Sequence, residues 1–141
     1  MNLDQQELTD LKKWAADQWS TCDLGDARRT QRAMKVGAAI ARLPAASLPE
    51  QMIKWSQSIA AYRLLNSEDV THEKLSKPHW ENTIENARTS LASVVLFLQD
   101  TTELDYTQPQ EREDIGYIGN GKGRGIMVHS SLAVIPTPEN P

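Results

Sequence analysis

Residues 24–42 of this chain read LGDARRTQRAMKVGAAIAR, and this stretch decides how the N-terminal part folds. Leu24 and Gly25 interrupt the helical pattern that precedes them, and Asp26 is a residue type that favours the N-cap of a helix. Apolar residues then recur at helical spacing until Pro44 ends the pattern. We therefore predict a helix that is capped by Asp26 and runs to about residue 42.

One side of this predicted helix is strongly basic. Residues 26–42 hold five basic residues against one acidic residue, in a chain that has 15 basic and 19 acidic residues in all. At about 100° per residue, four of the basic residues fall within a stripe about 80° wide. They are Arg28, Arg32, Lys35 and Arg42. Such a stripe suits DNA, because guanidinium groups bind phosphate oxygens and can read guanine in the major groove. A solvated helix face is the alternative interpretation.

Further helices are predicted on both sides of this one. Leu and Trp residues recur at helical spacing before it, and Ser47 with Glu50 forms a capping-box pattern after it. Pro78 suits the first turn of a last helix. The predicted helices are residues 5–20, 48–65, 71–75 and 79–90.

The pattern changes to β-structure after residue 92. Ser93–Leu98 is a short apolar run that predicts a strand buried on both faces, and residues 126–135 predict a second strand after a hairpin-type loop. Two strands alone are marginally stable in water, so we expect a larger α/β sheet. Asp100 lies at the end of the first predicted strand, where catalytic and metal-binding carboxylates often lie, although a turn residue or helix cap is the commoner role.

Composition excludes several classes of protein. The net charge is −4, so the chain as a whole is not a basic nucleic-acid coat. A single cysteine, Cys22, cannot form an internal disulfide, and no Cys and His residues have the spacing of zinc ligands. The first ten residues are unlike a signal peptide, and the longest apolar block, residues 92–98, is too short to span a bilayer. We expect a cytoplasmic protein without a membrane partner.

Four short motifs occur in a fixed order along the chain. They are Trp14-Ala15-Ala16 with Leu24–Arg32, Ala61–Asn66 with Val70-Thr71, Leu98–Thr102, and Val128–Leu132. Together they resemble the N-terminal part of the bacterial cut-and-paste DDE transposases of insertion-sequence family four, the Tn-five type. The resemblance covers nearly the whole chain in collinear order.

This resemblance implies a fold of two parts. Residues 1–70 would be an α-helical DNA-binding subdomain, and residues 71–141 would be the start of an α/β RNase H-like catalytic domain with its first strands only. Asp100 would be the first of three acidic residues that hold two Mg²⁺ ions for DNA cleavage and joining. The second Asp, the Glu and the Tyr-Arg-Lys motif of the family lie beyond position 141. We therefore expect an N-terminal portion that is inactive alone and binds Mg²⁺ weakly, if at all.

The resemblance also implies a DNA partner, the terminal inverted repeats of a transposon, with full-length transposase as a further partner. Arg28, Arg29 and Arg32 match its DNA-gripping segment, with Tyr62 and Arg63 as further candidates, and the basic stripe adds Lys35 and Arg42. The family has a Lys-Tyr pair where this chain has Arg42 and Leu43. Such a protein works in the bacterial cytoplasm, at the nucleoid when bound to DNA. The alternatives are a metal nuclease acting alone, a regulatory transposase fragment, and a non-catalytic helical domain that binds another protein.

Overall fold

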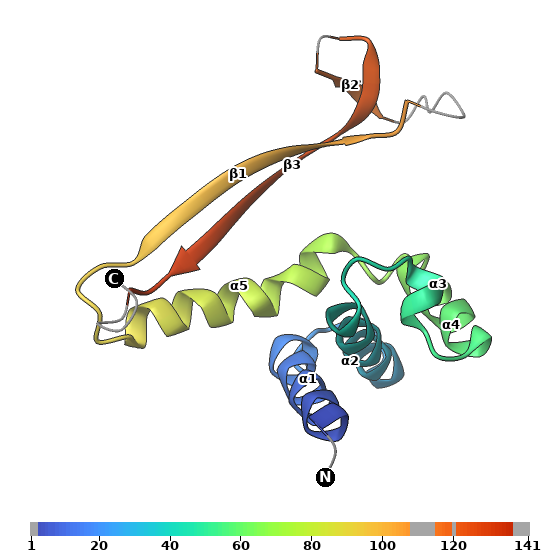
Figure 1. Ribbon diagram of the computed structural model, residues 1–141, viewed down its shortest axis with the longest axis horizontal. Coiled ribbons are helices and arrows are strands. Elements are labelled where there is room, and N and C mark those ends of the chain that lie inside the picture. The colour runs from blue at the N-terminus through green and yellow to red at the C-terminus, as the bar shows by residue number, and fades with distance from the viewer. Residues whose placement is uncertain (1–2, 108–114, 120, 137–141) are drawn as a thin grey trace. The chain divides into compact units, whose positions relative to one another are not determined.

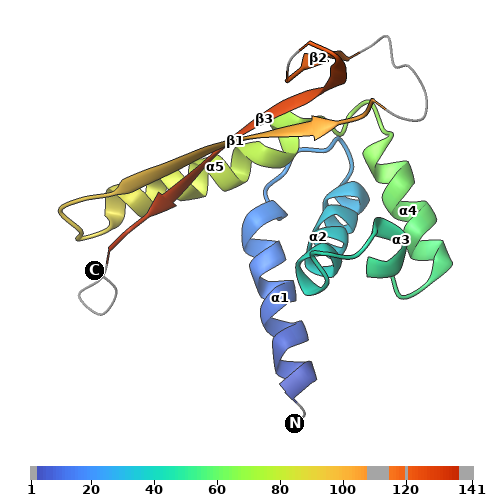
Figure 2. The ribbon, with the colours of Figure 1, turned by 45° about the horizontal axis from the view of Figure 1, so that its top comes forward.

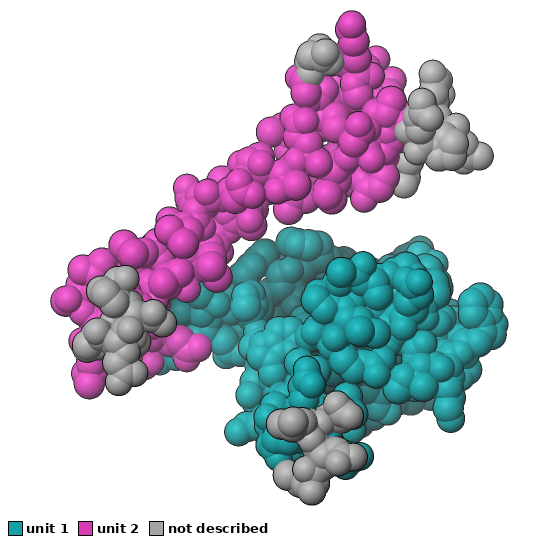
Figure 3. Space-filling model, in the orientation of Figure 1, with its two compact units in different colours: residues 1–85 teal, residues 86–141 magenta. Residues whose placement is uncertain are grey.

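The computed structural model describes residues 3–107, 115–119 and 121–136, with side chains from residue 5 onward. The chain divides into two compact units, residues 1–85 (unit 1) and residues 86–141 (unit 2), coloured separately in Figure 3. The long helix that contains residue 85 begins in unit 1 and ends in unit 2. The division into a helical subdomain and the start of a catalytic domain at residue 70 stays a prediction.

Unit 1 is helical, with α2 at its centre. Figures 1 and 2 show α1 along one side of α2, with α3 and α4 on another side. The helices predicted over residues 5–20 and 26–42 are confirmed within two residues at each end. The helices are α1 (Leu3–Trp19), α2 (Ala27–Arg42), α3 (Leu48–Gln51), α4 (Trp55–Leu65) and α5 (His72–Thr89).

A close contact between Trp19 and Gly37 joins α1 to α2. A Cβ atom at Gly37 would lie 2.1–2.8 Å from three atoms of the Trp19 ring, so glycine is what lets the indole reach this depth. The indole Nε1 donates a hydrogen bond to the Leu75 carbonyl at 3.2 Å, and the ring meets Trp14 edge to face. The buried core around this contact consists of Cys22, Leu24, Ala33, Val36, Met52, Ala61, Leu64 and Val70.

The single helix predicted over residues 48–65 is wrong, because the chain leaves the helix at residues 52–54. The buried side chain of Gln51 donates hydrogen bonds to two carbonyls of the loop that follows α2, at 3.0 Å each. The Gln57 carboxamide oxygen accepts the backbone N–H groups of Ile53 and Lys54 and so starts α4 separately. These two polar side chains stabilise the break that the apolar spacing conceals.

The two short helices predicted over residues 71–75 and 79–90 are instead one helix, α5. Thr71 caps its first turn, where the Oγ1 atom accepts the Lys74 N–H at 3.2 Å. Pro78 lies inside the helix and is buried. Proline in a helix interior removes one backbone hydrogen bond and usually marks a boundary. Here the helix continues through it, and burial of the ring offsets part of that cost.

Unit 2 contains a three-stranded antiparallel sheet in the order β1-β3-β2 (Figure 1). The strands are β1 (Leu96–Asp105), β2 (Gly116–Ile118) and β3 (Gly123–Val134). In the β1–β3 pair, Leu96 lies opposite Val134 and Asp105 lies opposite Gly125. The turn between β2 and β3 has Gly119 and Gly121 at φ values of 58° and 81°, which favour glycine. The predicted hairpin-type loop is therefore confirmed.

The prediction for the first strand is wrong in two respects. Strand β1 starts three residues later than Ser93 and continues through Asp105, and all ten of its residues are exposed rather than buried on both faces. Successive side chains of a strand point to opposite faces. One face of the β1–β3 ribbon therefore carries an apolar set, and the other face carries mainly polar residues. The apolar set is Leu96, Leu98, Leu104, Ile126, Val128, Leu132 and Val134.

Candidate nucleic-acid interface

The N-terminus of α2 is built on Asp26. Its backbone is extended, at φ −153° and ψ 129°, and its carboxylate accepts the Arg28 N–H at 2.8 Å. The same carboxylate pairs with the Arg28 guanidinium at 2.7 Å, and these bonds lower the pKa of Asp26 to about 2. The Arg28 side chain nevertheless stays 90% exposed. Ion pairs at this degree of exposure contribute little to stability, so a phosphate group can replace the carboxylate at small cost.

Arg29 has a different environment from Arg28. Its Nη1 atom donates to the Leu24 carbonyl at 3.0 Å and to the Asp69 carboxylate at 2.5 Å. Gly25 adopts a positive φ of 75° beside this contact, and a Cβ there would lie 3.2 Å from the Arg29 Nη1 atom. This arginine therefore holds the loop before α2 against the turn that follows α4.

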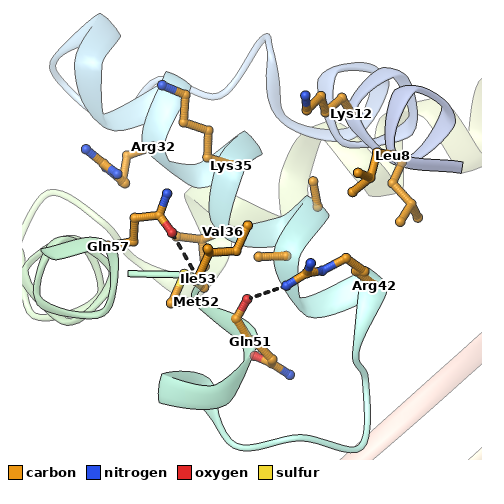
Figure 4. A pocket seen from close by; sticks show the side chains of 13 residues that line it. Leu8, Lys12, Arg32, Lys35, Val36, Arg42, Gln51, Met52, Ile53 and Gln57 are labelled. Carbon is orange, nitrogen blue, oxygen red and sulfur yellow. Dashed lines mark hydrogen bonds between the residues drawn. The ribbon is translucent and has the colours of Figure 1, made fainter. Parts of the chain in front are cut away.

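Basic side chains from α1 and α2 line one groove of unit 1, with a cavity volume of about 360 Å³. Lys12 comes from α1, and Arg32, Lys35 and Arg42 come from α2; we call the space between them the basic groove (Figure 4). Val36 and other apolar residues form its floor, and the Arg42 Nη2 atom donates to the Gln51 carbonyl at 3.2 Å.

The charge of the basic groove is of one sign. None of the described residues that line it is acidic, so its four cations have no carboxylate partner within the groove. Like charges held close together repel one another, and an anion that approaches them relieves this repulsion. The arrangement favours a polyanion whose charges are spaced along a chain, such as the phosphate backbone of a nucleic acid.

The structure brings some of the predicted contact residues together and leaves others apart. Three of the four residues of the basic stripe line the groove, and Arg28 lies one helical turn before Arg32 on the same side of α2. Tyr62 and Arg63 are exposed on α4 and do not line the groove. Their contacts with DNA stay a prediction.

Lys12 is the groove residue that the sequence did not single out. It follows Leu11 and lies four residues after Leu8, and both leucines line the same groove. This spacing places Lys12 at the edge of the α1 face that packs on α2. The sequence therefore indicates that Lys12 lies near α2. Only the packing of α1 on α2 shows that Lys12 lines the same groove as the cations of α2.

Asp100 lies within a strand rather than at a strand end, so its predicted position is wrong. It is the fifth of the ten residues of β1 and faces Ser130 across the ladder. Its carboxylate accepts the Thr102 hydroxyl at 3.2 Å. The strand continues because Thr101 and Thr102 are β-branched and find partners on β3.

Among the residues that the structure describes, no cluster of metal-binding side chains surrounds Asp100. Magnesium takes six oxygen ligands at octahedral positions and is usually bound by carboxylates together with substrate phosphates. Within residues 3–107, 115–119 and 121–136, no group of three or more His, Cys, Asp or Glu side chains could hold a metal ion. Asp100 thus brings a single carboxylate, and the described residues complete no two-metal site.

Comparison with known families gives a match within the helical part. Residues 11–70 match the family of transposase DNA-binding domains. The match runs from the middle of α1 to the turn after α4, so it includes all four cations of the basic groove and also Arg28, Tyr62 and Arg63. It supports a transposase N-terminus and indicates DNA as the partner. Within the described ranges, no helix combines the length and apolar character that a membrane span needs.

Proposed function

We propose that unit 1 binds the terminal inverted repeats of a transposon, as the DNA-binding part of a DDE transposase of insertion-sequence family four. The observation that supports this proposal most strongly is the basic groove, in which α1 and α2 gather four cations with no acidic residue among the described lining. The match of residues 11–70 to transposase DNA-binding domains supports the same proposal. Such a protein acts in the bacterial cytoplasm, at the nucleoid when bound.

The proposed binding mode assigns the cations to the DNA backbone. Lys12, Lys35 and Arg42 contact phosphates along the groove, and each contact releases condensed counterions from the duplex. Arg28 and Arg32 stand one turn apart on α2, and their planar guanidinium groups also fit the O6 and N7 atoms of guanine. Phosphate contacts provide affinity for any duplex, and the two arginines provide preference for one sequence.

A salt titration of binding tests the proposal. Duplexes selected by the purified protein from a random pool are labelled with a fluorophore, and affinity is measured by anisotropy over a range of salt concentrations. With Lys12, Lys35 and Arg42 on phosphates, the slope of log affinity against log salt is expected to be about −3. Lys12→Ala should make that slope shallower by about one.

Lys13→Ala is the matched control for this experiment. Lys13 is exposed and adjacent to Lys12 on α1, yet it does not line the basic groove. Its replacement removes the same charge from the same helix and should leave the slope unchanged. Equal slopes for the two variants would refute the basic groove as the DNA site.

The catalytic part of the proposal needs acidic residues in addition to those that the described part of the chain places near one another. We propose that unit 2 belongs to an RNase H-like catalytic domain in which Asp100 is the first acidic residue. The apolar face of the β1–β3 ribbon, on which Asp100 also lies, supports this view, because such a face needs a covering layer. Full-length transposase is a proposed partner of the chain. The Mg²⁺ chemistry requires carboxylates additional to Asp100.

One observation favours a second candidate function, a domain that binds another protein. A separate groove of about 450 Å³ in unit 1 is almost wholly apolar and is lined by Trp14, Ile40, Leu65 and Trp80, which are 40–48% exposed. Exposed aromatic residues of this kind are enriched in protein interfaces. Under this alternative the protein, with its net charge of −4, would bind duplex DNA only weakly. The titration would then show no steep dependence of affinity on salt.

A further inference from the structure

Two neighbouring arginines at the start of α2 differ in what they contact. The Arg28 side chain is 90% exposed and forms an ion pair with Asp26, the N-cap residue of the same helix. The Arg29 side chain is 36% exposed and bonds to a residue 40 positions away in the sequence. The sequence suggests that Arg28 and Arg29 are two equivalent DNA-binding residues. In the structure Arg28 is exposed, whereas Arg29 joins two segments of unit 1.

The contacts of Arg29 connect the start of α2 to the turn between α4 and α5. Its Nη1 atom lies 2.5 Å from the Asp69 carboxylate and 3.0 Å from the Leu24 carbonyl, and Leu24 is buried. Gly25 lies between Leu24 and the cap of α2, and a Cβ atom there would lie 3.2 Å from the Arg29 Nη1 atom and 3.6 Å from the Asp69 carboxyl carbon. The bridge therefore links the first turn of α2, which carries both Arg28 and Arg29, to the turn that contains Asp69.

We propose that Arg29 and Asp69 form a positioning pair, which fixes the first turn of α2 for DNA binding without itself contacting DNA. This inference rests on the proposed function and adds to it a residue, Asp69, that lies on no DNA-facing motif. It also changes the proposed role of Arg29 from a residue that contacts DNA to a residue that positions α2. Both acceptors bind the same nitrogen, Nη1, and lysine carries its ammonium group on a side chain that is one atom shorter, so lysine cannot hold both acceptors as arginine does.

Removal of the Asp69 charge separates this inference from simple electrostatics. Asp69→Asn makes the protein more positive by one charge and leaves Arg29 at most a neutral hydrogen bond in place of the ion pair. If Arg29 contacted DNA, or if only net charge mattered, this variant would bind DNA more tightly. A positioning pair predicts weaker binding, because α2 loses its fixed orientation although no DNA contact has been removed.

Glu68→Gln is the matched control. Glu68 is an exposed acid in the same turn, and no hydrogen bond or ion pair of its side chain occurs among the described residues. The substitution Glu68→Gln changes the net charge by the same amount as Asp69→Asn. Both variants and Arg29→Lys are first shown by circular dichroism to be fully folded at the temperature of the binding assay.

The experiment measures affinity and salt slope for the labelled selected duplex. Relative to Glu68→Gln, we expect Asp69→Asn to bind about two- to fivefold more weakly, as a coupling of about 0.5–1 kcal/mol would produce. Arg29→Lys should lose a similar factor, the double variant should lose no more than either single variant, and all slopes should equal that of the wild type.

Three results would overturn the inference. Asp69→Asn that binds as tightly as Glu68→Gln, or more tightly, would show that the pair positions nothing. A slope that becomes shallower by about one in Arg29→Ala would make Arg29 a phosphate contact. A wild-type protein without salt-dependent binding would refute the proposed function itself, and with it this inference, whereas the first two results leave DNA binding by the basic groove intact.

Discussion

The variant Gly37→Ala tests the packing of α1 on α2, which forms the basic groove. A Cβ at position 37 would lie 2.1, 2.6 and 2.8 Å from three atoms of the Trp19 ring. The ring cannot move freely, because its Nε1 atom bonds to the Leu75 carbonyl and its edge meets Trp14 at a centroid distance of 5.4 Å. The methyl group must therefore displace the indole and weaken both contacts.

The magnitude follows from opposing effects. Overpacking of a well-packed contact costs about 1–3 kcal/mol, and loss of the indole hydrogen bond costs about 1 kcal/mol more. Alanine in a helix interior is about 1 kcal/mol more favourable than glycine. We therefore expect a net loss of about 1–3 kcal/mol in the free energy of unfolding, which corresponds to a decrease in Tm of about 5–15 °C.

The assay is urea unfolding followed by far-UV circular dichroism and by tryptophan fluorescence. The double variant Trp19→Phe/Gly37→Ala is the internal control, because the smaller ring leaves room for the methyl group. Adding Gly37→Ala to the Trp19→Phe protein should therefore cost less than adding it to the wild type. A Gly37→Ala protein at least as stable as the wild type would refute the close contact. Its stability would then reflect only the higher helix propensity of alanine.

Three further predictions concern other parts of the chain. Gln51→Leu should lower the free energy of unfolding by about 1–3 kcal/mol in urea titrations, because two loop carbonyls lose their buried amide donor; an unchanged midpoint would contradict this. Because the pKa of Asp26 is about 2 in the folded chain against a usual value of 3.8, its contribution to stability is present above pH 3.8 and is lost as the pH falls toward 2. Asp26→Asn should therefore show less acid sensitivity in that window, and equal pH profiles of Tm would count against the cap. Because no group of three or more metal-binding side chains forms among the described residues, the protein should leave end-labelled duplex DNA intact in Mg²⁺ or Mn²⁺; cleavage that disappears in Asp100→Ala would reveal a site that the described residues do not show.

The elements that follow local rules could be predicted from the sequence. Asp26 has the residue type and position of an N-cap, and α2 begins and ends where the cap and the proline indicate. The break between α3 and α4 could not be predicted from apolar spacing, since it depends on Gln51 and Gln57, whose carboxamides bond to backbone groups in loops and turns. Polar side chains of this kind have no periodic signal.

The candidate site could also be predicted only where it depends on local sequence patterns. A single helix determines the angular positions of Arg28, Arg32, Lys35 and Arg42, so the stripe follows from the period of the helix. Lys12 joins them only through the packing of α1 on α2. The partner of Arg29 is 40 residues away, and the extent of β1 around Asp100 depends on pairing with β3. Such contacts between distant segments are beyond local patterns.

The most direct test of the central claim, that the basic groove binds DNA, is chemical footprinting of lysines in the unaltered protein. The free protein and its complex with the selected duplex are acetylated briefly, and the modification of each lysine is quantified by mass spectrometry. Lys12, Lys13 and Lys35 are all exposed, and only Lys12 and Lys35 line the groove. We predict that DNA protects Lys12 and Lys35 and leaves Lys13 reactive. Protection of Lys13 with Lys12 and Lys35 still reactive would contradict the account.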